Sequence, residues 1–156
     1  MSPPLNIVLV TPEIPQNTGA IGRLCVNLDA SLHLIRPLSF SLDETHLKRA
    51  GLDYWPHVDL HVHDSWEAFL QACAPAAERL HFLSTHADRG LYDERFATGA
   101  WLVFGCETAG LAPVFHERYG DRMLRIPVPG AHHRSLNLAN AVAIVAYEAR
   151  RQVDGW

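Results

Sequence analysis

The sequence has few cysteines, and they show no pairing pattern. Cys25, Cys73 and Cys106 are widely separated and form no C-x-x-C pair, which excludes a zinc finger and a thioredoxin-like redox motif. An odd number of scattered cysteines favours free thiols in a reducing compartment. We therefore expect a cytoplasmic protein that is not held together by disulfides.

Long apolar runs and an excess of basic charge are also lacking. No apolar run approaches the roughly 18 residues that cross a bilayer, and the first ten residues lack the basic start of a signal peptide. No membrane partner is expected. The 13 Lys and Arg are outnumbered by 17 Asp and Glu, for a net charge of -4. Nucleic-acid binding driven by overall charge is disfavoured, although a local basic patch is compatible with this balance.

The remaining composition is that of a folded globular chain. Its 156 residues are 48% apolar and include only 10 Gly and 10 Pro, which excludes disordered and collagen-like classes and suits one domain over residues 1–156. Short apolar runs alternate with helical patterns, which predicts an α/β fold, a parallel sheet with helices on both faces. The expected strands cover residues 5–10, 32–35, 57–63, 80–83, 101–104 and 125–128, and the expected helices cover residues 17–28, 43–50, a segment around 66–70, and 137–151.

The last expected helix, residues 137–151, has almost no polar face before Tyr147. A helix that is apolar around most of its girth must be covered on more than one side. Either it is wedged deep in its own fold, or a second subunit covers it. We predict a homodimer through the C-terminal helix.

Ligands of open α/β sheets bind beyond the carboxyl ends of the strands, so the loops there are the candidate sites. The first loop, residues 11–23, contains neither G-x-G-x-x-G nor a P-loop, which disfavours a dinucleotide or nucleoside-triphosphate site. Its unusual feature is Arg23 within an apolar helical segment, where it either acts on a ligand or extends into solvent. In the second loop, residues 104–111, Gly105 permits close backbone approach, while Glu107 and Thr108 cap a helix or hold a turn.

The third loop, residues 126–137, is the best single candidate. Two prolines and a glycine restrict its shape, and Ser135 and Asn137 stand where side-chain oxygens cap a helix. A helix needs only one capping side chain, so Ser135 and Asn137 together are more than capping requires. The neighbouring Arg134 adds a charge that capping does not need either.

Ten histidines raise the question of a metal. His57, Asp59, His61 and His63 would share one face of a strand, which is a possible Zn or Ni ligand set. The same alternation is typical of a half-solvated strand, so we predict no metal.

Three sequence motifs, in this order along the chain, are similar to those of a known protein family. N-x-G-x-x-x-R at 17–23, FG-x-E-x-x-GL at 104–111 and IP…S-x-N-L-x-N-A at 126–141 resemble the SPOUT-class RNA 2′-O-methyltransferases. Residues 49–55 and 147–149 extend the match to the small, single-domain tRNA (cytidine/uridine-34) 2′-O-methyltransferase subgroup. The chain departs from that pattern at Cys106, where proline is common, and at Ala109, where arginine is common.

The resemblance implies a C-terminal deep trefoil knot, an obligate homodimer, and S-adenosylmethionine as the methyl donor. It places the donor against Leu83, Gly105, Ile126 and Ser135. The catalytic group that it implies is Arg23, with Ser135 and Asn137 at the same site.

The implied reaction is methyl transfer to the ribose 2′-hydroxyl of the wobble nucleotide, with the tRNA anticodon stem-loop as the partner. A non-catalytic RNA-binding or ribosome-assembly module on the same fold is the alternative. The basic residues expected to contact RNA are Lys48, Arg49, Arg134, Arg150 and Arg151.

Overall fold

The computed structural model describes residues 2–42 and 53–156, so the helix expected over residues 43–50 lies outside the described part. The core is one parallel sheet of six strands in the order β3-β2-β1-β5-β4-β6. The strands are β1 (Leu5–Val10), β2 (Ser31–Ile35), β3 (Asp59–His63), β4 (Leu80–Leu83), β5 (Ala100–Phe104) and β6 (Met123–Leu124). The predicted parallel α/β class is confirmed.

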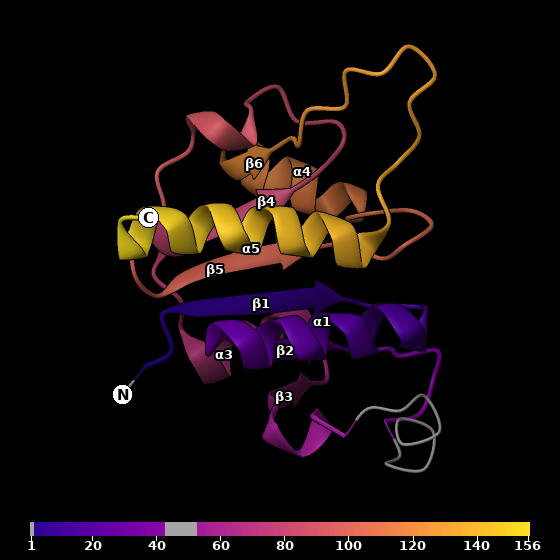
Figure 1. The fold of residues 1–156 in the computed structure, drawn as a ribbon. Helices are drawn as coiled ribbons and strands as arrows, with labels where there is room; N and C mark the ends of the chain where they lie inside the picture. Colours follow the sequence, from indigo (N-terminus) through magenta and orange to yellow (C-terminus); the bar gives the residue numbers. More distant parts are fainter. Residues whose placement is uncertain (1, 43–52) are drawn as a thin grey trace.

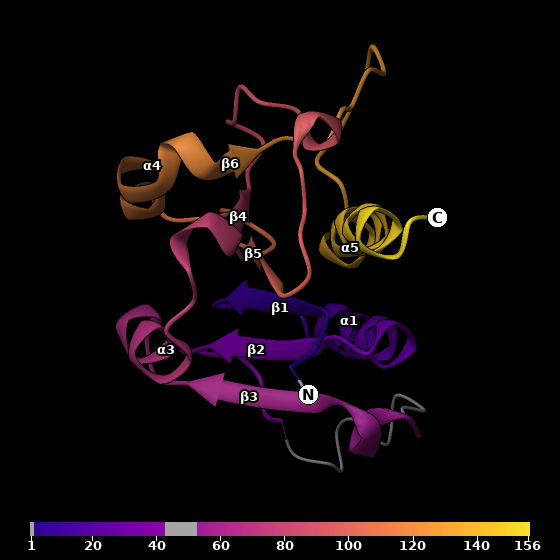
Figure 2. The same cartoon turned by 90° about the vertical axis from the view of Figure 1, so that its left-hand side faces the viewer.

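Helices cover both faces of the sheet. Two of them, α1 (Pro15–Leu28) and α5 (Leu138–Asp154), lie on one face, and α3 (Trp66–Cys73) and α4 (Pro113–Tyr119) lie on the other (Figure 2). Every residue of β1 is buried, as expected for a central parallel strand between two helical layers. Each face of the sheet contributes its own apolar core cluster. No helix in the described ranges is long and apolar enough to cross a membrane.

Helix α5 buries one side only. Val142, Val145, Ala146 and Ala149 are fully buried against α1, β1 and β5. Other apolar side chains of the helix remain partly or fully exposed, including Tyr147 at 46% exposure. Within this chain the helix is therefore not wedged on all sides, and an apolar surface is left over.

Two predicted strands differ from the structure by two residues or more. The third strand begins at Asp59 and not at residue 57, because Trp55–His57 form a turn of 3-10 helix. The last strand is Met123–Leu124 and not residues 125–128. Prolines at 127 and 129 have no N–H to donate to a sheet ladder, so pairing stops early.

The chain leaving β6 runs beside the segment that connects β4 to β5. The Arg125 N–H donates to the Arg89 carbonyl at 2.8 Å, and the Leu91 N–H donates to the Arg125 carbonyl at 2.8 Å. The trefoil knot implied by the resemblance stays a prediction.

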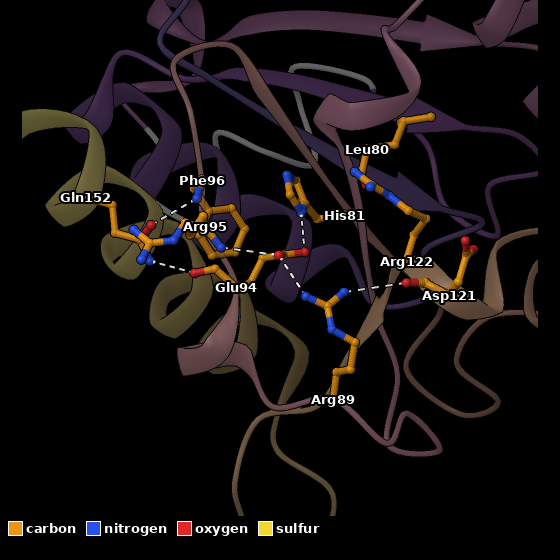
Figure 3. A network of polar contacts seen from close by, with 9 residues as sticks. All are labelled: Leu80, His81, Arg89, Glu94, Arg95, Phe96, Asp121, Arg122 and Gln152. Carbon is orange, nitrogen blue, oxygen red and sulfur yellow. Dashed lines mark hydrogen bonds and ion pairs between the residues drawn. The ribbon is translucent and has the colours of Figure 1, made fainter.

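A polar network centred on Glu94 fixes this connecting segment (Figure 3). One carboxylate oxygen of Glu94 accepts from His81 Nδ1 at 3.0 Å, and the other accepts from Arg89 at 2.9 Å. The Gln152 side chain of α5 donates to the Glu94 carbonyl at 3.0 Å and accepts from the Phe96 N–H at 2.9 Å. Strand β4, the connecting segment and α5 are thus joined through one carboxylate and one amide.

Burial favours the neutral form of both acid and base in this network. It lowers the pKa of His81, which stays neutral and donates its Nδ1–H to the carboxylate. Burial also opposes ionisation of Glu94, but hydrogen bonds from His81 and Arg89 outweigh it and leave the pKa of Glu94 below its usual value of 4.5. An ionised Glu94 therefore stabilises the fold above pH 4.5, and this contribution is lost as the pH falls through the lowered pKa.

Glu94→Gln should lower the free energy of unfolding by about 1–3 kcal/mol at pH 7, because the buried His81 loses a charged acceptor. Below pH 4.5 the difference from the parent should shrink, since the parent carboxyl becomes protonated as well. Urea unfolding followed by circular dichroism from pH 7 to pH 3 measures both effects. The exposed Glu78 provides the control Glu78→Gln, which should match the parent throughout. A Glu94→Gln deficit that does not change with pH would contradict the assignment.

Candidate functional site

The carboxyl ends of β5, β4 and β6 are neighbours at one edge of the sheet, on the right in Figure 1. Leu83 ends β4, Gly105 directly follows β5, and Ile126 comes two residues after β6. Leu83 and Ile126 belong to the same apolar cluster, together with Leu138 at the start of α5. Three of the four residues expected to contact a methyl donor therefore lie on adjacent strand ends.

Gly105 is confined by its own turn. A Cβ at this position would lie 2.0 Å from the carbonyl carbon of Gly110 and 2.2 Å from the nitrogen of Leu111, so no side chain fits. The turn closes through Cys106, whose N–H donates to the Gly110 carbonyl at 3.3 Å and whose carbonyl accepts from the Gly110 N–H at 3.0 Å. A proline at 106 would lack the first of these donors.

Glu107 extends from this turn to the start of α1. Its carboxylate accepts from the N–H of Glu13 at 2.8 Å and from that of Ile14 at 2.7 Å. Ile14 is the N-cap of α1 and offers no side-chain acceptor of its own. Glu107 instead binds the N–H of the cap residue itself and that of the residue before it, and its negative charge suits the positive end of the helix dipole. Of the two roles predicted for Glu107, capping a helix or holding a turn, its hydrogen bond from the Ile14 N–H fits the first, with α1 as the helix.

A second carboxylate makes the reciprocal connection. Glu13 accepts from the Thr108 N–H at 3.0 Å and from the Thr108 hydroxyl at 2.8 Å. These hydrogen bonds, the backbone one first, lower the pKa of Glu13. The loop after β1 and the turn after β5 therefore hold each other through two glutamates.

Asn17 connects this pair of loops to the third. Its amide nitrogen donates to Glu107 at 3.2 Å, and its amide oxygen accepts from Asn137 Nδ2 at 3.0 Å. Asn137 in turn caps α5, accepting from the Asn140 N–H at 3.2 Å, as its predicted capping role requires. The buried Asn17 thus joins one residue from each of the other two motifs.

Arg23 is exposed on α1, and its guanidinium carbon lies 5.8 Å from the centre of the Tyr54 ring. Burial raises the pKa of Tyr54, which keeps its hydroxyl protonated, and this hydroxyl donates to the Gly19 carbonyl at 2.8 Å. Trp55 packs against Gly22 so closely that a Cβ there would lie 2.5 Å from the indole. Sequence reasoning assigned no role to Tyr54 or Trp55, although both belong to the matched segment 49–55.

The segment 127–136 projects away from the sheet edge (Figure 1), and Ser135 is exposed. Arg134 is exposed as well and donates to the carbonyls of His132 and His133 at 3.0 and 3.2 Å. In the described part of the chain, no hydrogen bond joins Arg23 or Ser135 to Asn137. Of the three expected catalytic residues, only Asn137 is therefore held in the network.

The other basic residues are distributed unevenly. Lys48 and Arg49 lie outside the described residues. Arg150 donates to the Leu28 carbonyl and to Asp154, and Arg151 pairs with Glu148 at 2.7 Å. Both arginines are some 13 residues along α5 from Asn137, which is about 20 Å, so one subunit does not gather them with Arg134.

The histidines of β3 do not converge as a single ligand set. His61 pairs with Asp59 at 2.9 Å, and both are exposed. His63 instead faces His33 on β2 and Cys73 on α3. The sequence pattern of β3 could not reveal the group formed by His63, His33 and Cys73, because His33 and Cys73 belong to other elements.

Comparisons with known proteins agree on one family. The model of the SpoU rRNA methylase family matches residues 4–147. A tRNA (cytidine(34)-2'-O)-methyltransferase from Polaromonas sp. (strain JS666 / ATCC BAA-500) is 50% identical over 94% of this chain and 90% of its own. A solved structure described as giving insights into 2-OH methylation of C/U34 on tRNA has a TM-score of 0.86 and 49% identity, covering 97% of both chains. The fold is also similar to the SpoU methyltransferase AviRb from Streptomyces viridochromogenes in complex with AdoMet, with a TM-score of 0.79, 24% identity, and coverage of 97% of this chain and 59% of AviRb.

Glu107→Gln tests the link between the loops. A neutral amide can accept only one of the two backbone hydrogen bonds well, and its NH2 group faces another donor, so stability should fall by about 1–3 kcal/mol. Thermal unfolding measures the loss, with the exposed Glu117→Gln on α4 as the control. Equal melting temperatures for the two variants would show that Glu107 does not hold α1.

Proposed function

Because the chain belongs to the SpoU rRNA methylase family, we propose that it transfers a methyl group from S-adenosylmethionine to the ribose 2′-hydroxyl of the wobble nucleotide, cytidine or modified uridine 34, of tRNA. The observation that carries this proposal is the Glu107–Asn17–Asn137 chain. It assembles three separate motifs at one sheet edge, in a protein whose relatives over nearly the full length are named for this reaction.

The edge formed by β5, β4 and β6 suits the methyl donor. Leu83 and Ile126 offer apolar walls, and the tight turn that only a glycine at 105 permits brings backbone groups to the end of β5. S-adenosylmethionine supplies an activated methyl group on its sulfonium, so the protein must mainly position the two reactants. In this proposal Ser135 completes the donor site when the exposed segment 127–136 closes over the edge.

Arg23 is the proposed catalytic residue on the RNA side. An arginine remains protonated in proteins, so it orients the target phosphate and stabilises negative charge developing on the 2′-oxygen. Tyr54 and the packing of Trp55 on α1 position it. Asn137 connects the start of α5 to Asn17, on the same helix as Arg23.

RNA binding is proposed to use exposed cations near this edge. The Arg134 guanidinium donates to the carbonyls of residues 132 and 133. To bind RNA it would exchange these hydrogen bonds for contacts with a phosphate group. Lys48 and Arg49 belong to the same proposal, as do Arg150 and Arg151 if a second subunit brings them near. The cytoplasm, where tRNA is modified and thiols stay reduced, is the proposed compartment.

The proposal predicts transfer of labelled methyl from S-adenosylmethionine to bulk tRNA, with nuclease mapping placing the label on the ribose of nucleotide 34. Label on a base, or at another position, would refute the assigned target. Binding of tRNA without any transfer would favour the non-catalytic RNA-binding alternative.

The same assay tests Arg23. Arg23→Ala should reduce methyl transfer by at least about a hundredfold, because the charge that acts in the transition state is gone, while donor binding measured by calorimetry stays near the parent value. Arg95→Ala removes another exposed arginine and should retain full activity. A large loss of donor affinity in Arg23→Ala would place Arg23 in the donor site instead.

We further propose that the uncovered side of α5 forms a homodimer. Tyr147 is 46% exposed on this helix, and its ring lies 6.3 Å from that of Trp156, itself 61% exposed. Such adjacent apolar surface on a helix is typical of a subunit interface.

Light scattering should give twice the 17.4 kDa mass of one chain. Tyr147→Glu should shift the protein toward monomer, because a charge would be buried without a partner. Tyr92→Glu changes a tyrosine that is 60% exposed elsewhere and should leave the mass unchanged. A parent protein of monomer mass at micromolar concentration would refute the dimer.

A further inference from the structure

Three metal-ligating side chains from three elements meet on the face of the sheet covered by α3. His33 is on β2, His63 ends the edge strand β3, and Cys73 is the last residue of α3. His33 Nδ1 lies 2.9 Å from His63 Nε2 and 3.9 Å from Cys73 Sγ. All three ligand atoms lie within 4.8 Å of one another.

A chain of hydrogen bonds sets the tautomer of His33. The Asn6 amide donates to two backbone carbonyls at the start of β5, so its oxygen accepts from the Ser31 hydroxyl at 2.6 Å. Ser31 Oγ, having donated its proton, accepts from His33 Nε2–H at 3.1 Å. The lone pair of His33 is therefore on Nδ1, which points toward His63 and Cys73. Such an outer hydrogen bond on the second ring nitrogen is typical of metal-binding histidines.

Both imidazoles are in the form that metals bind. Burial lowers the pKa of His33 to about 3 and also lowers that of His63, and nearby histidines add to each effect. A neutral imidazole has one free electron pair at neutral pH, so cation binding requires a change of tautomer at His63 but no loss of a proton from either ring.

The ligand spacing suits a small cation with modest adjustment. Zinc lies about 2.0–2.1 Å from imidazole nitrogen and about 2.3 Å from thiolate sulfur, so tetrahedral ligand atoms are about 3.3–3.6 Å apart. Only His63 and Cys73 need to move, and both are half-buried, at the edge strand and at a helix end. His33 is 4% exposed and fixed by its neighbours, which gives the site one rigid ligand and two adaptable ones.

We propose that His33, His63 and Cys73 bind a divalent cation of the zinc class, with a water molecule as the fourth ligand. Binding places the cation between the two rings, where a His63 N–H now bonds to His33. The proton on His63 Nε2 moves to Nδ1 through solvent, and the Cys73 thiol releases its proton to solvent.

The proposed role is structural. The cation would tie β3, the outermost strand on its side, to β2 and to the end of α3. Edge strands expose unpaired backbone groups and are prone to fray or to pair wrongly. The three ligands lie on β2, β3 and α3, and none of them belongs to the ends of β4, β5 and β6 that are proposed to bind the methyl donor, so the cation site does not depend on the proposed function.

Cobalt(II) is the probe, because its visible spectrum reports coordination and a thiolate ligand adds a near-ultraviolet charge-transfer band. Chelator-treated full-length protein should bind one Co2+ per chain with this band, and one equivalent of Zn2+ should abolish the band. Zn2+ should also raise the melting temperature, since it binds the folded state. Absence of a thiolate band in the parent would overturn the proposal.

Four variants locate the site. Cys73→Ser should remove the charge-transfer band, and His63→Gln should weaken Co2+ binding by at least about tenfold. The matched controls are Cys106→Ser, another half-buried cysteine, and His61→Gln, whose ring stacks on His33 at 4.5 Å without belonging to the ligand set. Both controls should bind Co2+ as the parent does. A band that survives Cys73→Ser, or that disappears in Cys106→Ser, would overturn the assignment.

Discussion

The arrangement of the site depends on one carboxylate at the start of one helix. Helix α1 begins at Pro15 with Ile14 as its cap residue, and Ile14 cannot accept a hydrogen bond through its side chain. Glu107, in a turn more than ninety residues further along the chain, instead accepts from the backbone N–H of Ile14 itself. Hydrogen bonds to a charged acceptor are worth about 1.5–3 kcal/mol each. The same carboxylate orients Asn17, and Asn17 orients Asn137, so the position of α5 depends on it as well.

Most of the fold could be predicted from the chain because most of its strands are buried between two layers of helices. A strand covered on both faces, such as Leu5–Val10, is an uninterrupted apolar run, and alternation with helices then implies a parallel sheet. The errors occurred where backbone hydrogen bonding, and not side-chain polarity, decides the boundary. Val128 is apolar, but the prolines at 127 and 129 prevent the ladder from continuing. A pattern of apolar residues contains no information on this point.

The roles of single residues in the site could be predicted from the sequence, but the hydrogen bonds between distant residues could not. The capping roles of Asn137 and Glu107 follow from residue type and place, and the resemblance supplied the family from three motifs in order. No local pattern pairs Glu13 with Thr108 or Asn17 with Asn137, because these partners are 95 and 120 residues apart. The same limitation concealed the approach of His63 to His33 and Cys73. Only the placement of β2, β3 and α3 around one face brings these three together.

The separation of 120 residues between Asn17 and Asn137 has a consequence for how the protein is made. During translation the first strand and helix leave the ribosome long before residue 137 is added, so a nascent chain has the amino-terminal half of the site and no partner for it. The link between Asn17 and Asn137 forms only after residue 137 has been added. A polypeptide released before that point therefore lacks α5 and leaves the Asn17 amide oxygen without its Asn137 donor.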